Sequence, residues 1–214
     1  VMEDFFINDL SLWYVRRSRK RFHQESTDRA KAIETLYYVL VKTATMLAPV
    51  MPFLAENLYQ ELKTDGMPES VHLCDWPKSD SSGTDLELEQ KMDEVRSVVT
   101  LALAERAKKA IKVRQPLSTL SIKNEKLKIV HSPEFLDIVK EEVNVKNIVF
   151  DALVESEIVL DTIITPALKE EGVIRDVIRD AQEKRKEAGL TPNSKADMEI
   201  CVASDLKSVI ENNK

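Results

Sequence analysis

Glycine is scarce in this chain, and that scarcity constrains the fold more than any other feature. Only 4 of 214 residues are glycine, and charged residues make up 32% of the sequence. Glycine destabilises helix interiors, so its near absence together with many charges favours long helices with solvated outer faces. Phosphate-binding loops need several closely spaced glycines. We therefore expect a mainly α-helical protein without such a loop.

Three stretches before residue 66 repeat apolar residues at helical spacing. The first runs to about Phe22; the second starts after a possible cap at 26–28 and ends at Pro49; the third starts at Pro52 and ends before Gly66. The predicted inward faces are Phe6, Leu10, Trp13 and Tyr14; Ile33, Leu36, Tyr37, Leu40, Ala44 and Leu47; and Phe53, Ala55, Leu58, Tyr59 and Leu62. Residues 70–77 are predicted to be an extended segment over these helices, with Val71, Leu73 and Trp76 as its apolar residues.

A polar segment at 78–85 (KSDSSGTD) is the best linker in the sequence. It predicts one domain at 1–80 and a second at 81–214. The second domain is expected to begin with a long helix at 86–112, whose core-facing residues are Leu88, Met92, Val95, Val99, Ala102 and Ala110. Strands are predicted at 117–122, 145–150, 157–160 and 197–202. Further helices are predicted at 132–143, from Pro166 to about Ala188 with Gly189 as C-cap, and from 204 onward. The predicted fold is therefore mainly α, a helical bundle followed by a small α/β domain.

Net charge and metal-binding residues exclude some functions. The chain carries a net charge of −6, so any nucleic-acid site must be a local patch. The cysteines Cys74 and Cys201 and the histidines His23, His72 and His131 show no metal-ligand spacing. No apolar run approaches the roughly 20 residues of a membrane span. We expect a cytoplasmic protein that binds no metal, membrane or DNA.

The densest chemical signal is a run of cations that directly follows Trp13 and Tyr14. Five of the six residues at 16–21 are basic: Arg16, Arg17, Arg19, Lys20 and Arg21. On a helix, Arg17 and Arg21 continue the inward face, while the other three lie around its sides. Arginines beside aromatic rings suit a folded RNA, because guanidinium groups pair with phosphates and stack on unpaired bases. The alternative is structural: Arg17 and Arg21 pair with carboxylates of neighbouring helices, such as Glu34 or Glu56.

A second, weaker basic site lies at 111–117 (IKVRQPL), where the long helix ends. Lys112 and Arg114 could contact RNA. Cations near a helix C-terminus also interact favourably with the helix dipole, and this explains both residues without any ligand. Both interpretations remain open from the sequence.

Several motifs then match one family in the correct order. Residues 10–22 (LSLWYVRRSRKRF) resemble the segment that opens the anticodon-binding domain of isoleucyl-tRNA synthetases. Residues 47–59 (LAPVMPFLAENLY) and 70–77 (SVHLCDWP) are similar to segments that follow in that domain. Residues 111–117 and 184–190 (KRKEAGL) resemble motifs further downstream.

This resemblance implies that Trp13, Tyr14 and the cations at 16–21 grip the anticodon arm of tRNA(Ile). Lys112 and Arg114 would extend that surface, or their domain would brace the bundle. The family consists of cytosolic class Ia ligases that join isoleucine to its tRNA with ATP and magnesium. The HIGH and KMSKS motifs are absent here, so we expect this segment to be inactive alone and to need no cofactor.

Two further expectations concern the state of the segment. Phe5, Phe6, Ile7 and Leu10 already follow a helical pattern with no cap before them. The chain is therefore expected to be an N-terminally truncated piece of a longer synthetase, whose remainder is its partner. The alternative function is a structural or protein-interaction module whose arginines pair internally and which does not bind RNA alone.

Overall fold

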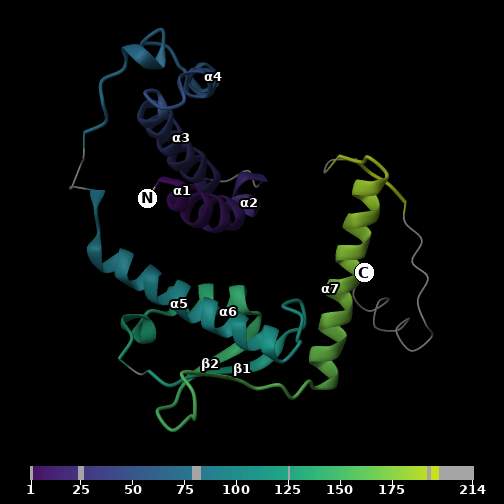
Figure 1. Ribbon diagram of the computed structural model, residues 1–214. Coiled ribbons are helices and arrows are strands. Elements are labelled where there is room, and N and C mark those ends of the chain that lie inside the picture. The colour runs from purple at the N-terminus through teal and green to yellow at the C-terminus, as the bar shows by residue number, and fades with distance from the viewer. Residues whose placement is uncertain (1, 24–26, 79–82, 125, 192–193, 198–214) are drawn as a thin grey trace. The chain divides into compact units, whose positions relative to one another are not determined.

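The computed structural model describes residues 2–23, 27–78, 83–124, 126–191 and 194–197. The chain divides into two compact units, 1–84 and 85–214, and the predicted boundary after residue 80 lies outside the described residues. The prediction of a mainly helical chain with a small α/β part is confirmed (Figure 1). The first unit contains α1 (Met2–Asp4), a π-helix (Phe5–Val15), α2 (Arg16–His23), α3 (Thr27–Leu47), α4 (Pro52–Leu62) and a 3-10 turn (Val71–Leu73).

The opening helix differs from an ordinary α-helix over Phe5–Val15. There it is wound as a π-helix, and the backbone N–H of Arg16 donates to the carbonyl of Ser11 five residues earlier. π-turns are rare and are frequently found at functional sites. The predicted inward face is nonetheless present, since Leu10 is buried and Trp13 and Tyr14 are half-buried.

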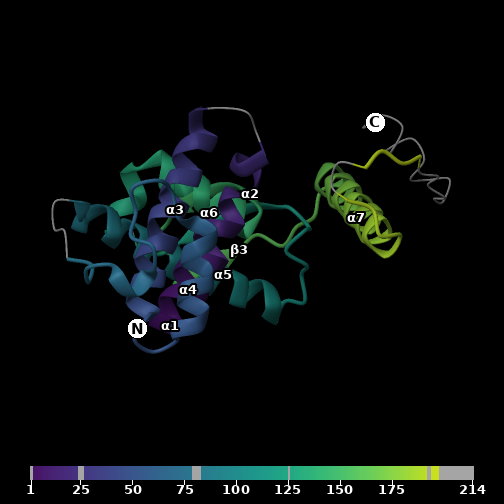
Figure 2. The same ribbon diagram turned by 90° about the horizontal axis from the view of Figure 1, so that it is seen from above.

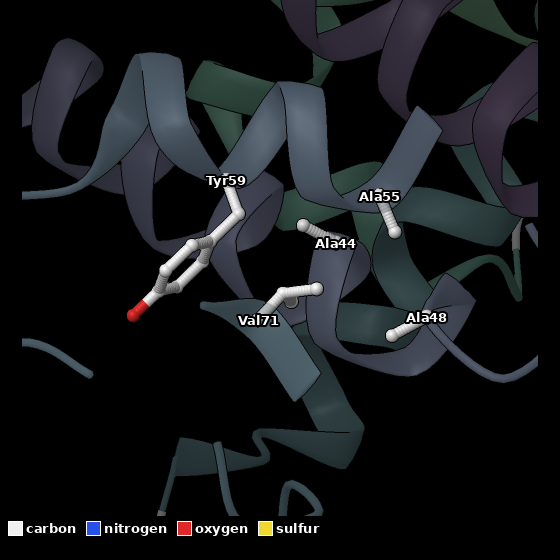
Figure 3. Close-up of a cluster of buried hydrophobic side chains, with 5 residues drawn as sticks. All are labelled: Ala44, Ala48, Ala55, Tyr59 and Val71. Atoms are coloured by element: carbon white, nitrogen blue, oxygen red, sulfur yellow. The ribbon is translucent and has the colours of Figure 1, made fainter. Parts of the chain in front are cut away.

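The core of the first unit is built on alanines where α3 and α4 pack side by side. Ala44 from α3 and Ala48 from the turn that follows it face Ala55 and Tyr59 from α4, and Val71 closes the cluster (Figure 3). Tyr59 is the largest side chain buried in this cluster, whose other members are alanines and one valine. This arrangement confirms the predicted inward positions of Ala44, Ala55 and Tyr59.

Two predicted core residues are instead exposed. Phe53 is 92% exposed and Ile33 is 45% exposed. Residues one or two apart on a helix do not share a face, so burial of Ala55 turns Phe53 outward. In the same way, burial of Ala32 turns Ile33 outward.

Residues 70–77 do not form the predicted extended segment. They begin with the 3-10 turn, and of the three apolar residues predicted to cover the helices only Val71 is buried, while Leu73 and Trp76 are exposed. Glu56 on α4 fixes this turn, because its Oε2 accepts hydrogen bonds from Ser70 Oγ and from the Val71 backbone N–H, each at 2.9 Å. The carboxylate of Glu56 therefore places Val71 in the core.

The hydrogen bonds to Glu56 predict a specific response to acid. Donation from Gln60, from the Val71 N–H and from Ser70 holds the pKa of Glu56 below its ordinary value of 4.5. A lowered carboxyl pKa stabilises the fold above the ordinary value, and this stabilisation is lost as pH falls through the lower, folded-state pKa. We expect Glu56→Gln to lower the melting temperature of the first unit at neutral pH, and this difference from wild type should shrink as pH falls below 4.5 and through the lowered pKa of the folded state.

Fluorescence of the two tryptophans, both in the first unit, measures that melting temperature. Glu61→Gln on the same helix is the control, because among the described residues Glu61 receives no hydrogen bond from the 70–71 segment. A constant melting-temperature difference from pH 7 to pH 3 would contradict the prediction.

The second unit is a three-stranded sheet with helices packed against it. Its elements are α5 (Leu86–Lys108), β1 (Leu117–Ile122), a 3-10 turn (Lys128–His131), α6 (Pro133–Val143), β2 (Val145–Phe150), β3 (Ile158–Leu160) and α7 (Pro166–Glu187). β1 is central, parallel to β2 with Leu117 opposite Val145, and antiparallel to β3 with Leu120 opposite Leu160. α6 makes the crossover between the parallel strands, and α5 and α6 pack against each other (Figure 1).

α5 ends four residues earlier than predicted. The Ile111 N–H donates to the Arg106 carbonyl and the Ala110 N–H to the Ala107 carbonyl, the pattern of a Schellman motif. Ala110 occupies the left-handed position of that motif with φ of 53°. Ala110 therefore lies outside the helix and is exposed, although it was predicted to be a core residue. Leu88, another predicted core residue, is 49% exposed.

We expect Ala110→Gly to raise the free energy of unfolding of the second unit by about 1 kcal/mol, since glycine adopts positive φ without the steric cost that a Cβ carries. Chemical denaturation followed by circular dichroism measures this change. Gly189, at φ of 70°, holds the same position after α7, and Gly189→Ala should shift stability in the opposite direction. A destabilised Ala110→Gly variant would contradict the assigned turn.

α7 matches its prediction at both ends and is one uninterrupted helix in both views (Figures 1 and 2). Thr165 caps it by accepting a hydrogen bond from the Leu168 N–H at 3.4 Å, and Gly189 follows its last turn. The strand predicted at 197–202, apart from its first residue, and the helix predicted from residue 204 onward lie outside the described residues.

Candidate nucleic-acid interface

The predicted basic residues lie on α2, directly after the π-helix. Arg16, Arg19 and Lys20 are exposed, while Arg17 and Arg21 are half-buried. This is the distribution that the helical spacing predicts. We call the exposed side formed by Arg16, Arg19 and Lys20 the α2 cationic surface.

Arg21 binds another helix rather than facing solvent with the other cations. Its Nε lies 2.7 Å from Asp28 Oδ2 and its Nη2 lies 2.8 Å from Asp28 Oδ1, so the two side chains form a bidentate ion pair. The hydrogen bond lowers the pKa of Asp28 and raises that of Arg21. The carboxylates proposed for this role from the sequence were Glu34 and Glu56, and the observed partner is Asp28 in the first turn of α3.

Tyr14 also connects the opening helix to α3. Its hydroxyl donates to the buried backbone carbonyl of Ala32 at 2.8 Å. Trp13 is half-buried beside it. The hydroxyl of Tyr14 is therefore engaged within the protein, and any contact of Tyr14 with RNA would use its ring.

The three cations of the α2 cationic surface differ in their contacts. Arg16 Nε donates to the backbone carbonyl of Leu12 at 2.7 Å, which orients its guanidinium at the junction of π-helix and α2. Within the described part of the chain, no carboxylate forms an ion pair with Arg19 or Lys20. These two side chains are available to an external anion.

Lys112 and Arg114 belong to the second unit, in the segment between α5 and β1. Lys112 is exposed. Arg114 Nε forms an ion pair with Asp176 Oδ1 on α7 at 2.5 Å. Arg114 therefore helps attach α7 to this segment, and Lys112 alone of the pair presents its charge to solvent.

Sequence reasoning missed the side chains that fix this segment. Arg106 is 1% exposed, with its Nη1 donating to the carbonyls of Lys112 and Gln115 and its Nη2 to that of Asn144. The amide of Asn144 donates to the carbonyls of Val113 and Arg114. Gln115 Nε2 reaches the Leu168 carbonyl on α7 at 2.8 Å.

Gly172 makes that approach possible, because a Cβ there would lie 2.5 Å from Gln115 Oε1. A glycine inside an otherwise strong helical pattern was the one available signal of this contact.

Other kinds of site find no support in the described residues. No group of three or more histidine, cysteine or acidic side chains there could hold a metal ion. Cys74 is half-buried and unpaired, and Cys201 lies outside the described residues. None of the described helices combines the length and the apolar character needed to cross a membrane.

Comparison with known proteins agrees with this geometry. The family model described as the anticodon-binding domain of tRNA ligase matches residues 1–122. The isoleucine–tRNA ligase of Chlamydia caviae is 43% identical over 147 residues, which cover 68% of this chain and 14% of that protein. The isoleucine–tRNA ligase of Protochlamydia amoebophila is 42% identical over 150 residues, 69% of this chain and 14% of the relative.

The family match spans the opening helix, α2 with its cationic surface, and the α3–α4 core, and it extends through β1. The aligned region is a small fraction of the length of each curated relative. The chain therefore belongs to the anticodon-binding domain family of tRNA ligases, and the relatives that it matches are isoleucine–tRNA ligases.

Proposed function

We propose that this chain is the part of an isoleucine–tRNA ligase that binds the anticodon arm of tRNA(Ile) in the cytoplasm. The α2 cationic surface carries the proposal, because Arg19 and Lys20 are exposed without an ion-pair partner among the described residues. These cations would neutralise phosphates of the arm, and such contacts position an RNA without reading its sequence. Sequence preference would come from stacking and edge contacts to unpaired loop bases.

In the proposed role the chain contributes by positioning and not by bond chemistry. Holding one end of the tRNA orients its acceptor end towards a catalytic domain elsewhere in the longer enzyme, and such orientation lowers the entropic cost of the reaction. ATP and magnesium would act in that other domain. We propose that the segment alone does not catalyse aminoacylation and does not bind DNA.

A tRNA titration with two matched double variants tests the proposal. Arg19→Ala/Lys20→Ala removes two unpaired cations of α2, whereas Lys126→Ala/Lys140→Ala removes two lysines of the second unit. We expect the α2 variant to bind a tRNA(Ile) transcript about tenfold more weakly at about 0.1 M salt. The slope of log affinity against log salt should fall by about two, one for each lost phosphate contact. Fluorescence anisotropy measures both quantities.

Stability measurements separate binding from folding. Neither double variant should change the melting temperature of the first unit, because neither pair of cations holds that unit together. Equal tRNA affinities for the α2 variant, the lysine control and wild type would overturn the proposal.

The bidentate pair of Arg21 with Asp28 favours a second function for part of the cluster, namely bracing α2 against α3. If bracing were the whole role of α2, Arg21→Ala would lower the melting temperature while the Arg19/Lys20 variant left tRNA binding unchanged. That pair of results would support the structural module instead of the RNA-binding segment.

A further inference from the structure

A groove runs along α5 in the second unit, and none of the residues assigned above to RNA is among those that line it. One hollow of about 310 Å³ lies between α5, the end of β1 and the start of β3. A second hollow of about 220 Å³ continues it and shares Leu101, Glu157 and Ile158 with the first. The two hollows therefore form one elongated depression.

The wall of the groove on α5 has the pattern of a helix–helix contact surface. Glu94, Val98, Leu101, Glu105 and Lys108 follow one another at spacings of three or four residues, so they form a stripe along one face. From Glu94 to Lys108 this stripe spans about 21 Å at 1.5 Å per residue. Leu101, in the middle of the stripe, is 42% exposed. This length suits a polypeptide segment better than a compact small molecule.

The floor of the groove is apolar and its rim is acidic. Val98, Ile122 and Ile158 line it and are buried, and the exposed side chain of Leu101 lines it as well. Among the described residues that line it, Asp93, Glu94, Glu105 and Glu157 carry carboxylates, and Lys108 carries the one cation.

Two of the four carboxylates already have protein partners. Lys108 Nζ is 2.6 Å from Glu105 Oε1, and Glu94 Oε2 accepts from the Ile129 N–H at 3.2 Å. Within the described residues, the side chains of Asp93 and Glu157 have no hydrogen-bond or ion-pair partner. The groove thus offers apolar contact area beside two unpaired negative charges.

We propose that this groove docks a partner polypeptide, an amphipathic helix with apolar side chains on one face and lysine or arginine beside them. Its apolar residues would pack around Leu101, and its cations would pair with Asp93 and Glu157. A phosphate backbone does not suit the site, because the rim would repel it. The second unit would then bind protein on this face, whatever the first unit does with RNA.

Binding of a designed peptide to the full chain tests the proposal. The probe is a fluorescein-labelled, 14-residue helical peptide with leucines at helical spacing and flanking lysines, and the comparison peptide carries glutamate in place of each lysine. We expect one lysine peptide to bind per chain and the glutamate peptide not to bind. Leu101→Gln and Asp93→Lys/Glu157→Lys should each weaken binding about tenfold, since they remove the apolar contact and reverse the rim charges.

The control variant is Glu61→Lys/Glu170→Lys, which changes net charge by the same amount at two residues that do not line the groove. It should leave peptide affinity within about twofold of wild type, and all variants should keep the wild-type melting temperature. Equal weakening by the two double variants would mean only that a basic peptide is attracted to an acidic protein, and it would overturn the proposal. Absence of binding up to about 1 mM, or displacement of the peptide by tRNA, would overturn it as well.

Discussion

Replacing Arg106 with alanine should lower the free energy of unfolding of the second unit by about 3–5 kcal/mol, because several buried backbone carbonyls lose their donor at about 1–3 kcal/mol each. The guanidinium is 1% exposed and donates to three backbone carbonyls, those of Lys112 and Gln115 at 3.0 Å and that of Asn144 at 2.9 Å. Burial lowers the pKa of Arg106 to about 10, so the group remains charged at neutral pH. Alanine would leave all three carbonyls without their donor and a cavity where the side chain lay.

Comparison variants separate the hydrogen bonds from the volume of the side chain. Arg106→Met fills much of the space without donating, and Arg106→Lys keeps a charge but lacks the planar fork that reaches three acceptors. Both should be destabilised less than Arg106→Ala. Circular dichroism during urea unfolding measures these effects, and tryptophan fluorescence reports the first unit separately, because both tryptophans lie there. Unchanged unfolding of the second unit in Arg106→Ala would contradict the assigned role.

The same variant addresses the function of the second unit. Arg106 holds the turn that carries Lys112 and Arg114, so its loss should misplace both side chains. If the second unit extends the proposed RNA surface, Arg106→Ala should weaken tRNA(Ile) binding under conditions where the first unit remains folded. If the second unit only binds protein through its acidic groove, tRNA affinity should stay the same.

Strands and caps of the second unit could be predicted because local chemistry decides them. β1 and β2 match their predicted limits at Leu117–Ile122 and Val145–Phe150. The helical pattern ends at Pro116, just before β1, and the segment of β2 is rich in β-branched residues, which favour strands. α7 begins at Pro166 after the Thr165 cap for equally local reasons.

The end of α5 could not be predicted, because a distant interaction opposes local preference. The apolar pattern predicted that Ala110 lies within the helix, and alanine is also the best helix former. In the structure the chain leaves the helix at Ala110, and the carbonyls of Lys112 and Gln115 meet the guanidinium of Arg106. Those contacts, together with Asn144 from beyond β1, depend on tertiary packing that no window of sequence contains.

In the candidate site, too, the features set by local sequence could be predicted and those set by tertiary contacts could not. The helical spacing of 16–21 predicted which cations face outward, and the exposure of Arg16, Arg19 and Lys20 agrees. Spacing could not tell which carboxylate Arg21 would meet, because Asp28 reaches it only after the chain has turned into α3. The π-helix before α2 was also not predicted, since apolar periodicity does not distinguish it from an α-helix over so few turns.

Replacing Tyr59 with alanine is expected to destabilise the first unit by about 3–5 kcal/mol, a loss typical of a large buried aromatic side chain. The ring is fully buried among Ala44, Ala55 and Val71 (Figure 3). Alanines cannot expand to fill the space that the ring leaves, so the cavity should persist. Tryptophan fluorescence during urea unfolding measures the loss, and the circular dichroism transition of the second unit should not move. A cost below about 1 kcal/mol would show that α3 and α4 collapse onto each other and that the ring is not the main support of this core.

The hydroxyl of Tyr59 adds a second, pH-dependent part to the same prediction. It donates to the Pro68 carbonyl at 2.9 Å, and Tyr59→Phe should cost about 1 kcal/mol because that carbonyl loses its donor. Burial raises the pKa of Tyr59 to about 12 from its ordinary 10.0. The folded unit therefore keeps this proton where the unfolded chain releases it, and stability present below pH 10 should fall as pH rises towards 12. Tyr59→Phe lacks the ionisable group, so its stability should fall less steeply over that interval; equal slopes for the two proteins would mean that Tyr59 does not titrate with unfolding.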